Sequence, residues 1–419
     1  MTESILNINE SFTIDESIEK YEYHEYSPQP GNLDHTSPIT IPIQCQDIFV
    51  HPSECEIVVE GRLTKADGTP YAEADQVTLC NNGILHLFSN IKYTLSGQQI
   101  EDINYPGKAT TMLGLVSYPN TFQGLDFLWA KDTHPEADSS KNEGFSTRHK
   151  HIVVNPKPGG SFSCCIPLRH IFGFAEDYTK IVYGFKHELT LVKQSENDAI
   201  FRADNAGPGK VTLDKVSWRV PHVEPALQQK ANLLKLIENK ASIDVAFRTR
   251  QCTEISVPQT LSFTWPLGIK SSPESPRWII VGFQTKKKDN QVANASIFDH
   301  VDVNRIHVTL NSMRHPEEDY NLSFPENKYT RAYRDAKAFL NTFYGSNLSG
   351  LACPEYKDLY PLFVFDVSKR SEKMKISVTD IQVKATFKTQ IPEGTDAFCL
   401  LISDKILEFK SDGSKMTII

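Results

Sequence analysis

The sequence of 419 residues is poor in the features that mark membrane proteins and nucleic-acid-binding proteins. No apolar run approaches the roughly 18 residues that a helix needs to cross a bilayer, so we expect no membrane span. The formal net charge is −8, and no overall basic field is available to attract nucleic acid. We therefore expect no strong direct binding to nucleic acid.

Cysteine is present but lacks the spacing of functional sites. None of the eight cysteines forms a CxxC pair, which argues against a zinc ribbon and a thioredoxin-type redox site. The acidic N-terminus carries no secretory signal, so we expect reduced thiols and a protein that is not secreted. The vicinal pair Cys164 and Cys165 lies in an apolar strand pattern, and only the nearby Arg169 and His170 favour redox sensitivity.

Basic residues are almost missing from the N-terminal arm. Residues 1–30 contain seven acids and a single base, Lys20, so this arm cannot neutralise phosphates. Two interpretations stay open. The arm is either a solvated acidic tail or a segment that docks on a neighbouring subunit.

Catalytic motifs are also missing. No HExxH, GxSxG, GxGxxG or Walker-type segment occurs. His149 and His151, followed by a Pro-Gly-Gly turn, resemble the metal site of cupins, which need a Glu soon after the second His and a further His. Val154 and Asn155 occupy the place of the Glu, and Ser161, Phe162 and Ser163 stand where the further His would be needed. We expect these histidines to lie in a solvent-exposed loop.

Two charged clusters complete the set of candidate sites. Lys286–Lys288 is the only concentrated basic run, and a solvated loop is favoured over a phosphate contact. The acidic stretch 315–319 suits a solvated turn better than a site for a hard cation. The sequence therefore predicts no catalytic, cofactor-binding or metal-binding residue, and a protein that is not an enzyme.

The sequence does contain the alternation of apolar and polar residues that is typical of β-strands. Apolar and polar residues alternate along Cys55–Leu63, Leu85–Leu95 and Ile381–Phe387, as in antiparallel strands with one buried face. Trp278–Phe283 is apolar on both faces, which predicts a central strand covered on both sides. Trp218 is in phase with its apolar neighbours and is assigned to the core, not to an exposed carbohydrate platform.

Helices are exceptions to this pattern. Tyr329–Tyr344 carries apolar residues at steps of three and four and is followed by Gly345, a typical stop. Pro225–Lys240 begins with a proline suited to a first helical turn and has an apolar stripe that includes Leu227. A weaker helical pattern covers Lys108–Val116. The sequence thus predicts antiparallel β-sandwiches with a few helices in their connections.

The strand pattern occurs twice. Asn90–Asp102 and Arg305–Asp319 are both strands that run into a polar turn and an acidic pair, and each precedes a helical stretch. The shared order predicts a duplicated chain with its boundary near residues 222–242.

Five segments carry a family resemblance. They resemble the double-jelly-roll major capsid proteins of polinton-like and adintovirus-type DNA elements, including copies integrated in animal genomes. The segments are Leu87–Glu101, Ile166–Lys180, Lys215–Pro225, Pro276–Asn290 and Tyr360–Glu372. The resemblance implies an all-β chain of two tandem eight-stranded jelly-roll sandwiches. We expect an acidic arm at 1–36, a first jelly roll at 37–222, a helical connector at 223–241 and a second jelly roll at 242–419.

The resemblance also implies a function. Such a chain is expected to self-assemble as pseudo-hexameric homotrimers, with lateral contacts between trimers, into an icosahedral shell completed by a minor or penton capsid protein. The expected location is the virion, assembled in the cytoplasm or nucleus of a host cell. The alternative is a non-catalytic β-sandwich module that binds a glycan or a protein ligand.

Overall fold

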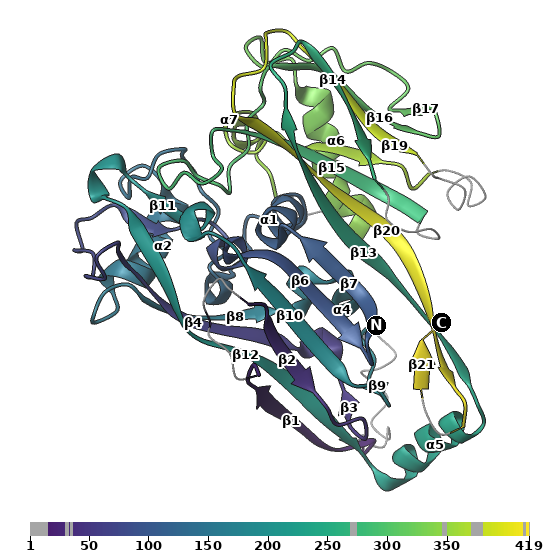
Figure 1. Ribbon diagram of the computed structural model, residues 1–419. Coiled ribbons are helices and arrows are strands. Elements are labelled where there is room, and N and C mark those ends of the chain that lie inside the picture. Colours follow the sequence, from purple (N-terminus) through teal and green to yellow (C-terminus); the bar gives the residue numbers. More distant parts are fainter. Residues whose placement is uncertain are drawn as a thin grey trace, which may run out of the picture.

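The computed structural model describes residues 16–29, 33, 37–268, 275–345, 350–369, 380–413 and 416–418. It consists of two antiparallel β-sandwiches in one chain. Figure 1 shows the first in purple to teal and the second in green to yellow, with helix α5 (Leu227–Glu238) at the lower end between them.

The first sandwich is built from two sheets and a small strand pair. One sheet has the order β8-β4-β12-β3-β9, with β1 paired to β12, and the other has the order β2-β10-β6-β7. The pair is β11-β5. The strands are β1 (Ile18–Tyr26), β2 (Ile39–Ile43), β3 (Phe49–Val50), β4 (Glu56–Lys65), β5 (Val77–Leu79), β6 (Phe88–Leu95), β7 (Gln98–Asn104), β8 (Ser161–Pro167), β9 (Val182–Tyr183), β10 (His187–Lys193), β11 (Ile200–Arg202) and β12 (Gly209–Pro225).

The second sandwich repeats this design. One sheet has the order β13-β20-β15-β18, with β21 on β20, and the other has the order β14-β19-β16-β17. The strands are β13 (Ser242–Val257), β14 (Ser262–Leu267), β15 (Ser275–Thr285), β16 (Val303–Leu310), β17 (Met313–His315), β18 (Phe363–Asp366), β19 (Ile381–Phe387), β20 (Thr395–Ser411) and β21 (Met416–Ile418).

Each core lies between the two sheets of its sandwich. In the first, Trp218 of β12 meets Tyr93 of β6 edge-on, with ring centroids 6.0 Å apart. In the second, Phe283 of β15 meets Phe263 of β14 and Phe387 of β19 in the same manner. Trp218 is completely buried, which confirms its assignment to the core.

The predicted alternation is confirmed in β4 and β19, where the inward side chains are buried and most of their neighbours are more exposed to solvent. The strand expected over Leu85–Leu95 is correct only from Phe88 onward. Residues Gly83–Leu87 form a 3-10 helix, η3, and all of them are buried. His86 looked solvent-facing because it is polar, but its Nε2 atom lies 3.3 Å from the Thr111 hydroxyl inside the protein.

Strand β15 is covered on both faces, as predicted. Trp278 packs edge-on against Phe339 and Phe343 of helix α6 (Thr330–Tyr344), while Phe283 faces the opposite sheet. The six residues from Trp278 to Phe283 are all buried.

The remaining helices are short and lie in the connections. They are α1 (Pro106–Ser117), α2 (Glu143–His149), α3 (Leu168–Ile171), α4 (Gly173–Asp177) and α7 (Cys353–Asp358), with a π-helical turn η5 at Lys150–Val154. The short 3-10 helices besides η3 are η2 (Pro52–Glu54), η4 (Leu125–Phe127), η6 (Glu196–Asp198) and η7 (Asp204–Ala206).

Two of the predicted helices agree closely with the structure and one needs correction. Helix α6 ends at Gly345, whose φ of +66° is the left-handed conformation expected at a helix stop. Pro225 is not a first helical residue, because it ends β12 and is paired with Ile18 of β1. Leu227 is 82% exposed, so its assignment to a packed stripe was wrong.

The two sandwiches share a local order of elements. In the first, β6 and β7 form a hairpin followed by α1; in the second, β16 and β17 form a hairpin followed by α6. This order matches the repeat inferred from Asn90–Asp102 and Arg305–Asp319. The two helices contact each other where the sandwiches meet.

Strands β13 and β20 form a long ribbon. They pair along their whole length, from Ser242 opposite Lys410 to Val257 opposite Thr395. The ribbon runs past the first sandwich, where helix α4 packs on β13 and Lys405 donates to the Ile100 carbonyl at 3.0 Å. Figure 1 shows it rising from the region of α5 into the second sandwich.

Candidate functional site

The histidine pair that resembled a metal site lies in helical structure and not in an exposed loop. His149 ends α2, is buried, and has its Nε2 atom 2.9 Å from the Asp75 carbonyl oxygen. His151 lies in the following π-helical turn and is half-buried. Phe145, one turn before His149, stacks on its ring and fixes this face of α2 toward the first sandwich. Among the described residues, no three His, Cys, Asp or Glu side chains are grouped so that they could hold a metal ion.

The lysine run 286–288 is largely engaged in ion pairs. Lys287 Nζ lies 2.8 Å from the Asp299 carboxylate and donates to the Ile297 carbonyl at 2.9 Å. Burial lowers the pKa of Lys287, and the expectation of a solvated loop was wrong for this residue. Lys288 pairs with Glu254 at 2.7 Å. Little positive charge is left for a phosphate.

The acidic turn and the vicinal cysteines show no reactive arrangement. Asp319 is paired with Arg314, and Glu318 lies 3.1 Å from Arg331, so arginines occupy the place of a cation. Cys164 is buried and Cys165 half-buried on β8, and burial raises the pKa of both thiols. A raised thiol pKa lowers the thiolate fraction and with it the reactivity.

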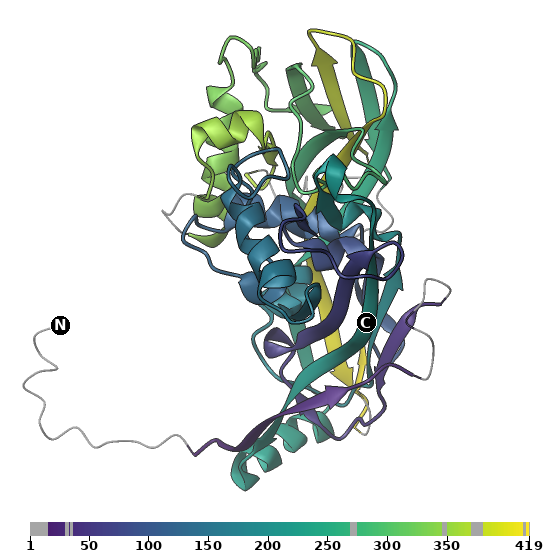
Figure 2. The ribbon, with the colours of Figure 1, turned by 90° about the vertical axis from the view of Figure 1, so that its left-hand side faces the viewer.

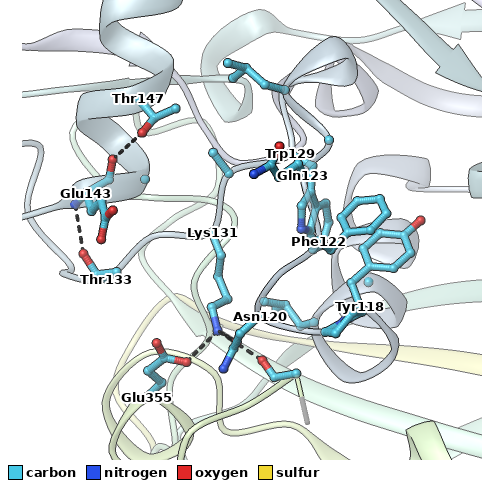
Figure 3. Close-up of a pocket in the computed structure, with 18 residues that line it drawn as sticks. Tyr118, Asn120, Phe122, Gln123, Trp129, Lys131, Thr133, Glu143, Thr147 and Glu355 are labelled. Carbon is cyan, nitrogen blue, oxygen red and sulfur yellow. Dashed lines mark hydrogen bonds and ion pairs between the residues drawn. The ribbon is translucent and has the colours of Figure 1, made fainter. Parts of the chain in front are cut away.

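A cavity lies on the first sandwich, where the second sandwich touches it. Its volume is about 490 Å³, and its wall is formed by the end of α1, the loop after it, α2 and the start of α7 (Figure 3). Tyr118 and Phe122 stack with ring centroids 4.0 Å apart, and Trp129 meets Tyr118 edge-on. Lys131 points across the cavity to Glu355 of α7, with Nζ 2.6 Å from the carboxylate.

The lining of this cavity lacks the residue types of a Ser-His or Cys-His catalytic site. None of its lining residues is a histidine, cysteine, serine or aspartate. The two threonine hydroxyls bind the backbone of Glu143, since Thr133 accepts from its N–H at 2.9 Å and Thr147 donates to its carbonyl at 3.0 Å. The threonine hydroxyls are therefore engaged with the backbone, and Lys131 is engaged in its ion pair with Glu355. What Lys131 and Glu355 do is connect the two sandwiches.

A buried polar network makes a second connection. The carboxylate of Asp132 accepts from Arg148 at 2.7 Å and, from the second sandwich, from Asn294 at 2.9 Å and Ser296 at 3.2 Å. The Tyr360 hydroxyl donates to the Asp132 carbonyl at 2.7 Å. Both charged side chains are completely buried, so the pair depends on these partners. Sequence reasoning missed this network, because nothing near Asp132 or Arg148 in the chain marks them as partners.

A third connection joins α4 to the β13–β20 ribbon. Arg248 pairs with Asp177, and its Nε atom donates to that carboxylate at 2.8 Å. Arg250 pairs with Glu176 and donates to the His170 carbonyl at 2.9 Å. Glu101 of β7 accepts from the backbone N–H of Arg250 at 3.2 Å, and burial raises the pKa of its carboxyl to about 7. Polar contacts at three places thus join the two sandwiches: the ion pair of Lys131, the hydrogen bonds to Asp132, and the ion pairs of the β13 arginines.

Part of the acidic arm is an edge strand. Strand β1 pairs antiparallel with the end of β12, and Figure 2 shows it in purple, beginning beside α5 and running away from that helix. His24 stacks on His222 with ring centroids 4.1 Å apart, and the Tyr26 hydroxyl lies 2.9 Å from His222 Nε2. Glu25 pairs with Lys215 at 2.5 Å. Residues 18–26 therefore form a strand on their own chain, with nearly all of their side chains exposed, while residues 1–15, 30–32 and 34–36 of the predicted arm lie outside the described residues.

Two sandwiches with the same order of elements, fixed side by side in one chain, match a known family. The family described as the double jelly roll-like domain matches residues 77–407. The chain belongs to this double jelly roll-like family. The predicted fold class, an all-β chain of two tandem jelly rolls with a few short helices, is thereby confirmed.

Solved structures share this double jelly roll at low sequence identity. The Sputnik virophage structure matches with a TM-score of 0.58 and 11% identity over 99% of this chain and 91% of that one. The mavirus major capsid protein gives a TM-score of 0.55 and 11% identity over 99% and 92%. PBCV-1 VP54, fitted into a reconstruction of Sputnik, gives 0.57 and 10% identity over 98% of both chains. No curated protein sequence matches the chain.

These likenesses establish the fold of the double jelly roll-like chain. The double jelly roll of viral capsid proteins is a structural and not a catalytic fold, in agreement with the prediction that the chain is not an enzyme. Within the described residues, no helix is long and apolar enough to cross a membrane.

Proposed function

We propose that this chain is a major capsid protein that self-assembles as pseudo-hexameric trimers into an icosahedral shell. The observation that carries the proposal is the joint between the two jelly rolls, formed by the hydrogen bonds of Asn294 and Ser296 to Asp132 and by the ion pairs of the β13 arginines. The likeness over nearly the whole length of the mavirus major capsid protein supports the same role.

The geometry of a double jelly roll suits a trimer. Two similar sandwiches fixed side by side give six similar bodies when three chains close into a ring, so one trimer can fill a six-coordinated lattice position. We assign the chain as an acidic arm at 1–36, a first jelly roll at 37–222, a helical connector at 223–241 and a second jelly roll at 242–419. The position of α5 between β12 and β13 supports this division.

The partners follow from the same role. We propose that the chain binds itself within and between trimers, and that a minor or penton capsid protein completes the shell. The location is the virion, after assembly in the cytoplasm or nucleus of a host cell, and the parent element is of the polinton-like or adintovirus type. We propose no strong direct binding to nucleic acid. The ion pairs of lysines 287 and 288 and the net charge of −8 support this view.

The test is the mass and outline of the purified full chain. We expect a trimer of about 142 kDa, three times the 47.3 kDa of one chain, with a hexagonal outline in negative-stain images. The measurement is light scattering over a range of protein and salt concentrations. A stable monomer under every condition would contradict the proposal.

The cavity in Figure 3 favours a second candidate, a non-catalytic binding module. Its stacked Tyr118 and Phe122 provide the kind of aromatic surface on which a ligand ring can lie. A monomer with saturable affinity for a glycan or a peptide, weakened by Phe122→Ala, would favour this candidate. A trimer without such affinity would exclude it.

A further inference from the structure

An apolar groove lies at the end of the molecule that carries α5. It is bounded by α5, by the β3–β9 edge of the first jelly roll and by the lower ends of β13, β20 and β21. The residues that line it are all uncharged, and they include Phe49, Leu233, Leu236, Ile243, Phe409 and Met416. Three separate parts of the chain therefore present one apolar surface.

This surface is incompletely covered. Leu236 is 50% exposed and Ile243 is 38% exposed, and α5 has no buried residue at all. Exposing such side chains to water costs about 25 cal/mol per Å² of apolar area, so a covering segment would stabilise the protein. We therefore expect an apolar segment to cover this surface.

The described chain begins beside this groove. The backbone N–H of Ala226, at the start of α5, donates to the Ser17 carbonyl at 2.9 Å. Leu233 and Leu236 lie seven to ten residues further along α5, a distance of about 10–15 Å at 1.5 Å per residue. Fifteen residues precede Glu16, and an extended chain of that length reaches about 50 Å. The N-terminal segment can therefore span the groove from its point of attachment.

The composition of residues 1–15 suits the groove. The segment has no lysine or arginine, three acids, and six large apolar side chains, which are Met1, Ile5, Leu6, Ile8, Phe12 and Ile14. The apolar side chains of the segment therefore match the uncharged lining of the groove.

We propose that residues 1–15 dock by their apolar side chains in the groove between α5 and the two jelly rolls of the same chain. Tethering beside the groove gives the segment an effective concentration in the millimolar range, an advantage over any free partner. The groove is thus an intramolecular docking site, and its role is independent of the assembly state.

Hydrogen exchange of the full chain tests this docking. We expect the amides of residues 1–15 to exchange at least tenfold more slowly than in a free peptide of the same sequence. Leu236→Glu should abolish this protection, whereas Leu227→Glu, on the same helix but outside the groove, should leave it unchanged. Phe12→Ser should also abolish the protection, and this substitution changes the docking segment while leaving the groove intact.

Three outcomes would overturn the proposal. The first is that the amides of residues 1–15 exchange in the unmodified chain as fast as in the free peptide. The second is protection that survives Leu236→Glu and Phe12→Ser. The third is protection that disappears on dilution, because it would place the segment in the groove of a second copy. Circular dichroism of the variants checks that α5 remains folded.

Discussion

Asp132 and Arg148 form an ion pair from which water is completely excluded. A buried charge without a partner is costly, and here the guanidinium also donates from Nε to the Leu79 carbonyl at 2.9 Å. The carboxylate in turn holds two side chains of the second jelly roll. The pair is therefore a point at which the two halves depend on each other.

Replacing Arg148 should be strongly destabilising. We expect Arg148→Ala to lower the free energy of unfolding by about 3–5 kcal/mol, because Asp132 is then buried without a counter-charge. The matched control is Arg62→Ala, since Arg62 pairs with Asp214 at 2.9 Å but the two side chains are 54% and 43% exposed. This control should cost less than about 1 kcal/mol. Urea unfolding of both variants measures the difference, and equal losses would count against the prediction.

Glu101 gives the joint a dependence on pH. Its carboxyl pKa rises from 4.5 to about 7 in the folded protein, chiefly because burial disfavours the charged form. The folded state then binds more protons than the unfolded state between these two values. Its contribution to stability is present below about pH 4.5 and is lost as the pH rises through about 7.

Glu101→Gln should remove this dependence. We expect the stability of the variant relative to the unmodified protein to increase by up to about 3 kcal/mol between pH 4.5 and 8, at 1.36 kcal/mol per pKa unit. Any cost of the amide to the contacts with Phe174 and Arg250 is the same at every pH. Urea unfolding at pH 4.5, 6 and 8 provides the measurement. A difference that stays constant with pH would show that Glu101 is ionised throughout.

At the scale of elements, strand β1 depends on a pair of histidines. Burial, and then the neighbouring His24, lower the pKa of His222 below 6.5 in the folded protein. The docked strand therefore binds fewer protons than the free one. Its attachment is constant above about pH 6.5 and weakens as the pH falls below that value.

Other charged groups lie in the cleft that these histidines share. Glu22 lies 3.9 Å from His24, and Lys20, Lys230, Asp47 and Glu224 also line the cleft. Because His222 stacks directly on His24, a charge on both rings is unfavourable even with these acids nearby. The unfavourable contact between the two charged rings therefore explains why a lower pH weakens the attachment of β1.

Acidification from pH 7 to 5 should loosen β1. We expect the amides of residues 18–26 to exchange several-fold faster at pH 5, after correction for the intrinsic effect of pH on exchange. His24→Phe keeps a ring on His222 but removes one charge, so it should reduce this response. The strands β13 and β20 are an internal reference, and a response of the same size there would indicate general unfolding instead.

The elements also show where sequence patterns succeed. Helix α6 has one wet face and a glycine stop, and both signals are readable. Helix α1 is buried on all sides, which leaves little periodicity to detect, and this accounts for the weak pattern over Lys108–Val116. The position of helix α5 was predicted correctly. The residues of its packed face were not, because only part of the apolar surface of that helix is covered.

At the scale of the whole molecule, the two sandwiches could be predicted because each repeats a local order. Ile91 and Ile306 occupy the same position in the equivalent strands β6 and β16, and the hairpins and helices that follow are near in sequence. The joint between the halves could not be predicted. Its partners, such as Asp132 and Asn294, are far apart in the chain, and no local rule links a buried aspartate to a distant amide.

The paired strands β13 and β20 have a mechanical consequence. They overlap for sixteen residues, about 50 Å at 3.3 Å per residue, with one end at α5 and the other in the second jelly roll. A force that pulls those ends apart loads the ribbon in shear, so its ladder of hydrogen bonds must give way together and not one by one. A wall made of such subunits would carry tension along these ribbons, while the cores on either side bear little of the load.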